Sequence, residues 1–544
     1  MPPETALDRA ETLLSRTGQE ANRPEPNRLD IVVRGDDVAE AVSALASAHW
    51  GYLSAITGLD SGASGLEALY HFCSGPDILT LRVRLHRDHA TLPSICAVIP
   101  SATVFERELS ELFGITMIGA PDTSRLLLPD DWPADVFPLR KDAKLANVPR
   151  SPHTPKSSTR FTIPIGPQHP ALKEPGHFEF EVDGEIVTAA SVRLGYAHRG
   201  IEKATEARSW TQDLYLLERV CGICSHVHAL AYCVGVERLA GVTVPPRAQA
   251  IRELVGELER IHSHLLWLGV TAHEAGFESL FMFAWRDRET VMDVLENVTG
   301  NRVNYSANLL GGVKIDIDVE RAQGIRKGVD FLEERTRHYL EEVGQDEAFL
   351  RRTRRIGVMD RTEAETLGVV GPTARASGVR RDIRDEAPYA AYATFPIAPS
   401  LRSRGDLEAR VLVRLLELFE SYRVIRELLD NLPSGPLVAR MPRRVVAGET
   451  VSRVEAPRGE LFYFVKSNGS DHPERIKIRT PTLCNMSSAV HMTVGRYLAD
   501  VPMLLAGVDP CFSCNDRTVI LRQPGAKEPW TWARLRQYAN EFYA

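Results

Sequence analysis

The chain has 544 residues, of which 44% are hydrophobic and 25% charged, and its formal net charge is −7. This composition is typical of a globular protein of roughly two to four domains, and the net negative charge argues against nucleic acid as the main partner. Its 8 cysteines are too few for a disulfide scaffold of this length. The first residues lack the apolar core of a signal peptide, and no window has the ~20 apolar residues of a membrane span. We therefore expect a cytoplasmic protein that reaches a membrane only through partner subunits.

The first part of the chain is predicted to be a small α+β domain. Residues 1–28 are polar and rich in proline and glutamate, which predicts a flexible arm. Residues 29–142 contain short strands and helices: Leu79–Leu85 alternates apolar and charged side chains, and Phe105–Ile115 has the pattern of an amphipathic helix that ends at Gly114. The charged residues of this domain are expected on solvated faces and at interfaces. Residues 143–158 have the proline- and serine-rich composition of a linker.

Residues 159–517 are predicted to form a mainly α-helical domain with a β-hairpin region at its start. The hairpin spans residues 179–192 and turns at Asp183-Gly184. Apolar residues at intervals of three and four then predict core-facing helices. The helices are expected at about 224–240, 246–275, 278–309, 319–345 and 406–431. Residues 518–544 form a C-terminal extension that ends in an amphipathic pattern.

Two cysteine pairs carry the strongest chemical signal. Cys221 and Cys224 flank Gly222, which lets the backbone turn so that both thiolates face one ion. Cys511 and Cys514 form a second pair near the other end of the chain, so only a folded domain can bring the pairs together. Four thiolates make a soft site suited to nickel, iron or zinc. Structural zinc is the alternative, but such sites join nearby segments of small domains, so a redox metal is favoured.

The flanking residues carry a family resemblance. RVCGICSHVH at 219–228 and DPCFSC at 509–514 resemble the first and last signatures of the large subunit of nickel–iron hydrogenases. The ERE, LFGI and PLRKD segments within residues 106–142 resemble a peripheral-arm subunit of respiratory complex I, and GPQHP at 166–170 resembles the start of its quinone-site subunit. Together they resemble an energy-converting, complex-I-related hydrogenase of the formate-hydrogenlyase type, fused to a complex-I-like domain. The resemblance implies reversible reduction of protons to dihydrogen.

The resemblance also implies a metal centre. Cys221 and Cys511 would be terminal nickel ligands, while Cys224 and Cys514 would bridge nickel to an iron that carries carbon monoxide and cyanide. His228, one helical turn after Cys224, would donate to a bridging sulfur and tune it.

Other segments are implied to surround that centre. Glu202 in RGIE would relay protons, although a carboxylate at a helix start is the structural alternative. Arg458 in PRG would lie over the open metal position, although a surface ion pair is the alternative. Hydroxyl groups would hold the diatomic ligands of the iron. The residues implied for this surrounding layer are Thr480, Pro481, Thr482 and Asp509.

Two other functions remain open from the sequence. A metal-free quinone-site subunit of complex I shares the helical core and GPQHP but lacks the paired thiolates. A zinc-stapled assembly scaffold would keep the thiolates but would give no reason for the RGIE and PRG segments.

Partners and processing follow from the same resemblance. No further cysteine cluster could hold an iron–sulfur centre, so a small subunit with such a cluster is implied. Membrane-arm subunits and a low-potential donor such as formate dehydrogenase are also expected, with the enzyme peripheral on the cytoplasmic face of the membrane. Many relatives lose a C-terminal extension after nickel insertion, which predicts cleavage between Arg517 and Thr518. Arg517 stands where the common motif has histidine, and arginine cannot serve as the magnesium ligand of that form.

Overall fold

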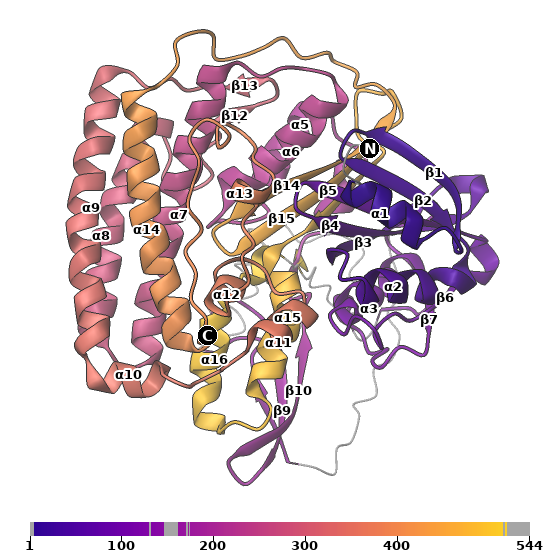
Figure 1. The fold of residues 1–544 in the computed structure, drawn as a ribbon, viewed down its shortest axis with the longest axis horizontal. Coiled ribbons are helices and arrows are strands. Elements are labelled where there is room, and N and C mark those ends of the chain that lie inside the picture. Colours follow the sequence, from indigo (N-terminus) through magenta and orange to yellow (C-terminus); the bar gives the residue numbers. More distant parts are fainter. Residues whose placement is uncertain are drawn as a thin grey trace, which may run out of the picture.

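A computed structural model describes residues 5–129, 132–145, 161–169, 172, 174–514 and 517–518. The N-terminal part contains a five-stranded sheet with strand order β1-β2-β5-β4-β3 (Figure 1). Strands β2 and β5 run parallel, and the other neighbours run antiparallel. The strands are β1 (Gly18–Glu25), β2 (Arg28–Val33), β3 (Tyr52–Asp60), β4 (Leu66–Ser74) and β5 (Asp77–Leu85).

Helices α1 (Ala6–Leu13), α2 (Val38–Ser47) and α3 (Ala102–Phe113) pack with this sheet in one apolar core. Helix α3 ends at Gly114, whose φ of 69° is the left-handed conformation that favours glycine. The prediction of a flexible arm is wrong for residues 5–28. Helix α1 starts with a capping box between Thr5 and Asp8, and β1 pairs with β2, so backbone hydrogen bonds order a segment whose composition is polar.

A second sheet covers the other face of the first. It consists of β14 (Gly448–Ala456), β15 (Gly459–Ser467) and β16 (Arg475–Arg479), which are antiparallel. Ala55 and Leu69 of the N-terminal sheet share an apolar cluster with Val451, Phe462 and Phe464. The prediction of a mainly helical domain with β-structure at its start missed this sheet. Charged side chains of this sheet, among them Arg453 and Glu460, are buried in ion pairs, so its strands lack a clear alternation of apolar and solvated polar residues.

Four long helices form much of a second apolar core (Figure 1). They are α7 (Pro246–Glu274), α8 (Glu278–Thr299), α9 (Val319–Gln345) and α14 (Leu407–Asp430). Their bounds follow the predicted ranges closely, except that α8 ends about a third earlier, before Gly300 in the left-handed conformation.

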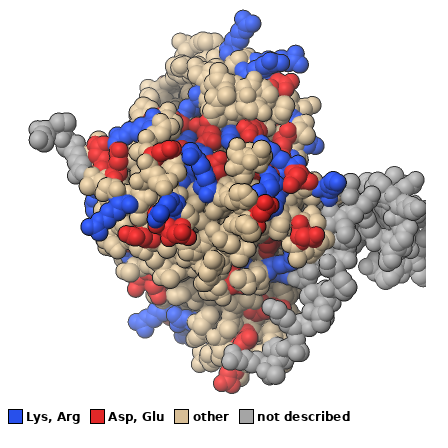
Figure 2. All heavy atoms as spheres, turned by 90° about the vertical axis from the view of Figure 1, so that its right-hand side faces the viewer, with Lys and Arg blue, Asp and Glu red and all other residues tan. Residues whose placement is uncertain are grey.

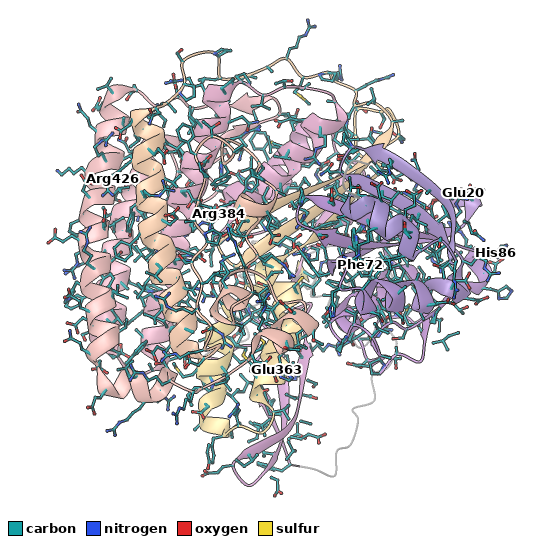
Figure 3. The ribbon with its side chains drawn as sticks, in the orientation of Figure 1. Glu20, Phe72, His86, Glu363, Arg384 and Arg426 are labelled. Atoms are coloured by element: carbon teal, nitrogen blue, oxygen red, sulfur yellow. The ribbon has the colours of Figure 1, made fainter. Side chains whose placement is uncertain are left out.

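Buried ion pairs lie between this bundle and the β14–β16 sheet. Arg384 is in the interior of the molecule (Figure 3), where it pairs with Glu257 at 3.0 Å and Asp382 at 2.7 Å. Arg375 pairs with Glu417 at 2.8 Å. Because these charges are desolvated, removal of one partner would leave another uncompensated, at a cost of about 3–5 kcal/mol.

The remaining helices and strands are shorter. The predicted hairpin is formed by β9 (His177–Asp183) and β10 (Ile186–Arg193), with β8 (Thr162–Ile165) beside β9. Helices α5 (Trp210–Glu218), α6 (Ser225–Leu239), α15 (Pro481–Thr493) and α16 (Val501–Val508) lead to the cysteine motifs. The other elements are β6 (Thr91–Pro93), β7 (Thr116–Ile118), β11 (Ala197–His198), α4 (Ile201–Thr205), β12 (Asn308–Leu309), β13 (Gly312–Val313), α10 (Glu347–Thr353), α11 (Arg361–Thr366), α12 (Gly371–Ala376), α13 (Ile383–Glu386) and β17 (Arg517–Thr518).

On the side of the molecule that Figure 2 shows, positive and negative side chains are interspersed rather than separated. The N-terminal part carries ion pairs at the surface, among them Arg34 with Asp37 and Arg23 with Asp8. Within the described residues, no helix is both long and apolar enough to cross a membrane.

Candidate metal centre

The four cysteines of the two distant motifs meet in one place. Cys221 Sγ lies 3.5 Å from Cys511 Sγ, and Cys224 Sγ lies 4.0 Å from Cys514 Sγ. The sulfurs of Cys511 and Cys514 are 3.0 Å apart. The first three side chains are buried and Cys514 is partly buried. The four sulfurs therefore form one compact, largely dehydrated donor set.

The first cysteine pair is shaped by the turn that enters α6. The N–H groups of Ile223 and Cys224 donate to Cys221 Sγ at 3.3 and 3.2 Å. Glu259 of α7 accepts from the N–H groups of His226 and Val227 at 2.7 and 3.2 Å, which satisfies the first turn of α6. Burial raises the pKa of Glu259 to about 8. The thiols are thus carried on a turn that the long helix α7 holds in place.

The second cysteine pair follows α16. Asp509 takes the left-handed conformation at φ 59° and turns the chain into Cys511. The Cys511 N–H donates to Thr482 Oγ1 at 3.1 Å, so α15 fixes the position of this cysteine. Thr480 and Pro481 are buried at the N-terminus of the same helix.

Arg199 joins the two cysteine loops. Its Nη2 donates to the Val220 carbonyl at 2.6 Å and to the Ser513 carbonyl at 3.0 Å. Glu174 accepts from the Ser513 N–H at 2.8 Å and also from the Ser513 hydroxyl. Burial, with the nearby Cys511, raises the pKa of Glu174 to about 7. Neither residue was predicted to have a role; only the position of Arg199 within the RGIE segment could have indicated one.

Arg458 lies at the turn of the β14–β15 hairpin. It is buried, its Nη2 donates to Asp509 Oδ1 at 2.9 Å, and its Nε donates to the Asp509 carbonyl at 2.9 Å. The surface ion-pair alternative is therefore wrong. Burial alone would lower the pKa of Arg458, but Asp509 and the cysteines Cys511, Cys224 and Cys221 raise it well above its ordinary value. A permanent positive charge thus accompanies the sulfur cluster.

His228 has one satisfied and one unsatisfied ring nitrogen. Its Nδ1 is 2.8 Å from the Tyr463 hydroxyl, whereas its buried Nε2 has no hydrogen-bond partner among the described residues. Burial lowers the pKa of His228 to about 4, so the imidazole is neutral. A buried ring nitrogen with no partner is uncommon and indicates that a missing group completes the site.

Glu202 does not hydrogen-bond to any cysteine sulfur in the described part of the chain. Its carboxylate accepts from Arg475 Nη2 at 2.8 Å and from the Ile478 N–H at 2.9 Å. It nevertheless shares the lining of a small cavity, about 60 Å³ in volume, with Cys514. The backbone of Arg517–Thr518 pairs with Ala197–His198 beside this region, while the predicted C-terminal helix lies outside the described residues.

The donor set fits a soft metal centre. Hydrogen bonding to Cys221 and burial raise the pKa of Cys511 to about 12, whereas hydrogen bonds from Cys221 and Cys514 lower the pKa of Cys224 to about 7. Four thiols this close, three of them buried, cannot all ionise without a cation, and such thiolate sets select nickel, iron or zinc.

Comparisons with known proteins agree with this arrangement. The family model described as "Nickel-dependent hydrogenase" matches residues 199–270. The models described as "Respiratory-chain NADH dehydrogenase, 49 Kd subunit" and "30 Kd subunit" match residues 274–447 with 439–517, and residues 31–148.

Individual relatives cover most of the chain. Formate hydrogenlyase subunit 5 of Escherichia coli is 35% identical over 91% of this chain and 90% of its own length. A subunit of the NADH-quinone oxidoreductase of Phocaeicola vulgatus is 33% identical over 85% of this chain and 94% of its own. A chain of an archaeal membrane-bound sulfane sulfur reductase has a similar structure, with a TM-score of 0.63 and 33% identity over 66% of this chain and 98% of its own.

The fold defines a class of protein that includes the large subunits of nickel-dependent hydrogenases and the 49 Kd subunits of respiratory NADH dehydrogenases. Within this class, the chain belongs to the family of large subunits of complex-I-related, energy-converting nickel–iron hydrogenases, fused to a complex-I-like domain at the N-terminus.

Proposed function

We propose that this chain is the catalytic subunit of a membrane-associated nickel–iron hydrogenase. It would reversibly reduce protons to dihydrogen with electrons from a low-potential donor. The observation that carries the proposal is the meeting of Cys221, Cys224, Cys511 and Cys514 in one buried cluster beside Arg458. A large helical domain needs no metal staple, so this cluster serves chemistry rather than stability.

The cysteines would hold nickel and iron, with Cys221 and Cys511 on nickel and with Cys224 and Cys514 shared by both metals. The meeting of all four sulfurs, with neighbouring Sγ atoms 3.0, 3.5 and 4.0 Å apart, supports one shared site. The bound centre, with carbon monoxide and cyanide on its iron, would supply the redox chemistry and the binding of hydrogen.

The surrounding residues would orient and tune the site. Arg458, fixed by Asp509, would keep a positive charge over the open side without losing a proton. His228 would donate its unsatisfied Nε2–H to a ligand sulfur, with Tyr463 holding the ring. Thr482 would fix Cys511 through its N–H, and the hydroxyl groups of Thr480 and Thr482 would donate to the diatomic ligands. Glu202 would relay protons beside the metal centre, in the cavity that it lines together with Cys514.

The assembly would include an iron–sulfur small subunit, membrane-arm subunits of a complex-I-like complex, and formate dehydrogenase or another low-potential donor. The subunit would be peripheral on the cytoplasmic face of the membrane. Formate hydrogenlyase subunit 5 and the membrane-bound hydrogenase subunit alpha of Pyrococcus furiosus, both named as subunits, support this expectation.

A metal-free quinone-site subunit is the second candidate, because the NADH dehydrogenase 49 Kd model matches much of the helical domain. A metal assay separates the two. The complex, purified without chelator, should contain stoichiometric nickel and iron. It should reduce protons to hydrogen with electrons from a reduced viologen dye. Full zinc occupancy without nickel, or metal-free protein that reduces a quinone, would overturn the proposal.

A further inference from the structure

The cavity beside Cys514 is closed partly by the N-terminal domain. Glu108 of α3 and Leu127 line it together with Glu202 and Ile478 from the other side. A volume of about 60 Å³ exceeds the ~10–15 Å³ that one water requires, so the cavity can hold water between these side chains.

Lys477 of β16 lies between two carboxylates. Its Nζ donates to Glu108 Oε1 and lies 3.8 Å from Glu202 Oε1. The other Glu108 oxygen, Oε2, is buried and has no hydrogen-bond partner in the described parts of the chain. Glu202, in contrast, has Arg475 and the Ile478 N–H as donors. The charges of the N-terminal domain were predicted to lie on solvated faces and at interfaces. In the structure, Glu108 is buried at an interface, next to the cavity.

The two carboxylates have different environments. Burial raises the pKa of Glu108, and Lys477 offsets this only in part. Burial also acts to raise the pKa of Glu202, but Lys477, Arg475 and the Ile478 N–H together lower it. A pair of acids whose environments separate them in this way suits proton transfer, since one is ready to hold a proton while the other is ionised.

The other charged groups at the cavity do not compete for this role. Arg199 lines the cavity and Arg475 contacts Glu202, and both guanidinium groups stay protonated in proteins. Arg199 is engaged with the cysteine loops, and His198 Nδ1 accepts from the Gly200 N–H at 3.2 Å.

We propose that Glu108 of the N-terminal domain is the next proton-relay residue beyond Glu202. When a proton leaves the centre, an O–H bond forms at the Glu202 carboxylate as the bond that held the proton at the centre breaks. The Glu202 O–H bond then breaks as the proton passes to a cavity water, and that water gives one of its own protons to the ionised Glu108 at Oε2. The Glu108 O–H bond breaks in turn when the proton moves on through water to solvent, and both carboxylates return to the ionised state. In hydrogen evolution the proton moves in reverse. This inference rests on the proposed hydrogenase function, and it makes the N-terminal domain part of the proton route.

The test compares Glu108→Gln with Glu202→Gln and Glu106→Gln in the intact complex. Glu106 is the matched control, a buried carboxylate on α3 that binds Ser94 and the Ile95 N–H outside the cavity. Under deuterium gas in ordinary water, fast proton escape yields H₂, whereas slow escape yields HD. We expect Glu108→Gln and Glu202→Gln to retain nickel, to lower the H₂-to-HD ratio, and to slow hydrogen evolution at least about tenfold. Glu106→Gln should keep the wild-type ratio, and Glu108→Asp should restore much of it.

The outcomes separate the two hypotheses. Wild-type complex without nickel would contradict the proposed function. If nickel is present and the H₂-to-HD ratio falls in Glu202→Gln but stays at the wild-type value in Glu108→Gln, the relay role of Glu108 is refuted while the hydrogenase function stands. This holds even if the Glu108→Gln variant melts at a lower temperature. If Glu108→Gln does not retain metal, infrared difference spectra of Glu108→Asp decide. A carboxylic acid band that follows turnover must shift in that variant, and an unshifted band counts against the relay.

Discussion

Arg199 donates to the carbonyl oxygen of Ser513 at 3.0 Å, although the two residues are 314 positions apart in the chain. The same guanidinium also donates to the Val220 carbonyl immediately before Cys221. One side chain therefore sets the distance between the two cysteine loops. Because its contacts are to backbone carbonyls, it acts regardless of which side chains flank the cysteines.

Loss of this contact should loosen the metal centre. We expect Arg199→Ala to bind substoichiometric nickel and to lose it faster to a chelator, because charge-assisted hydrogen bonds that hold both loops are removed, each contributing about 1.5–3 kcal/mol. Arg208→Ala is the control, since Arg208 is exposed and donates to the Ala204 carbonyl of its own segment. Nickel content and chelator kinetics are measured on both. Equal retention in the two variants would show that Arg199 is dispensable.

Replacement of a cluster cysteine should remove nickel. Cys224→Ser substitutes a hard hydroxyl for a soft thiolate in the four-sulfur set, so we expect loss of nickel and of hydrogen evolution. Cys233→Ala is the matched control, because Cys233 is also buried on α6 but its sulfur faces the Leu309 carbonyl at 3.7 Å. Nickel at wild-type stoichiometry in Cys224→Ser would exclude this cysteine as a ligand.

The Arg458→Lys variant should keep a positive charge but lose the two hydrogen bonds that fix its position. A lysine cannot reproduce the two-point contact with Asp509, so the charge would move away from its fixed position. We expect hydrogen evolution to fall about a hundredfold to a thousandfold, in line with removal of a preorganised charge, while nickel is retained. The measurement pairs metal content with turnover. Full activity in the lysine variant would mean that only the charge matters.

The free energy of unfolding should depend on pH through the buried carboxyl group of Glu253. Burial, with Glu257 nearby, raises the pKa of Glu253 from 4.5 to about 9 in the folded chain. The folded state therefore holds a proton that the unfolded state releases above pH 4.5, so stability is full at low pH and declines as pH rises toward 9. Glu253→Gln removes this decline, and its melting temperature should exceed that of wild type increasingly between pH 6 and pH 9 on the basis of that linkage.

The control for this effect is Glu334→Gln, an exposed position on α9 that should follow the wild-type pH profile. Melting temperatures are compared across pH at constant ionic strength. Parallel curves for wild type and Glu253→Gln would mean that this carboxyl titrates alike in the folded and unfolded chain.

Maturation gives the last prediction. We expect the nickel-loaded subunit to end at Arg517, after removal of the residues from Thr518 onward. The pairing of this strand with Ala197–His198 places the proposed cut close to the cavity that Glu202 lines. Intact mass spectrometry of the active subunit measures the end directly. A mature chain that still ends at Ala544 would contradict cleavage.

Long helices were predictable because their signals are local. Helix α7 begins at Pro246, and α9 is capped by Asp318, so composition and capping residues fix both starts. The end of α8 was misplaced because the left-handed turn at Gly300 overrides the apolar pattern beyond it.

Buried charges explain what the sequence could not predict. Arg453 and Glu460 pair at 2.8 Å within the β14–β15 sheet, so residues that suggest a surface are in the core. Arg199 and Glu174 were missed for a related reason, since most of their partners are backbone groups of distant loops. The two cysteine motifs, in contrast, could be predicted from the spacing of their cysteines. Spacing alone did not indicate which side chains hold the two loops together.

The N-terminal sheet packs directly on β14–β16, so these contacts, and not the connecting segment alone, hold the two parts together. Phe462 and Phe464 are fully buried against that sheet, and Arg479 donates to the Ser54 carbonyl at 2.8 Å. Severing the chain between the two parts would therefore leave them associated, as two fragments of one cooperative unit. Expression of either fragment alone would expose an apolar sheet face and unpaired charges, and would favour aggregation over folding.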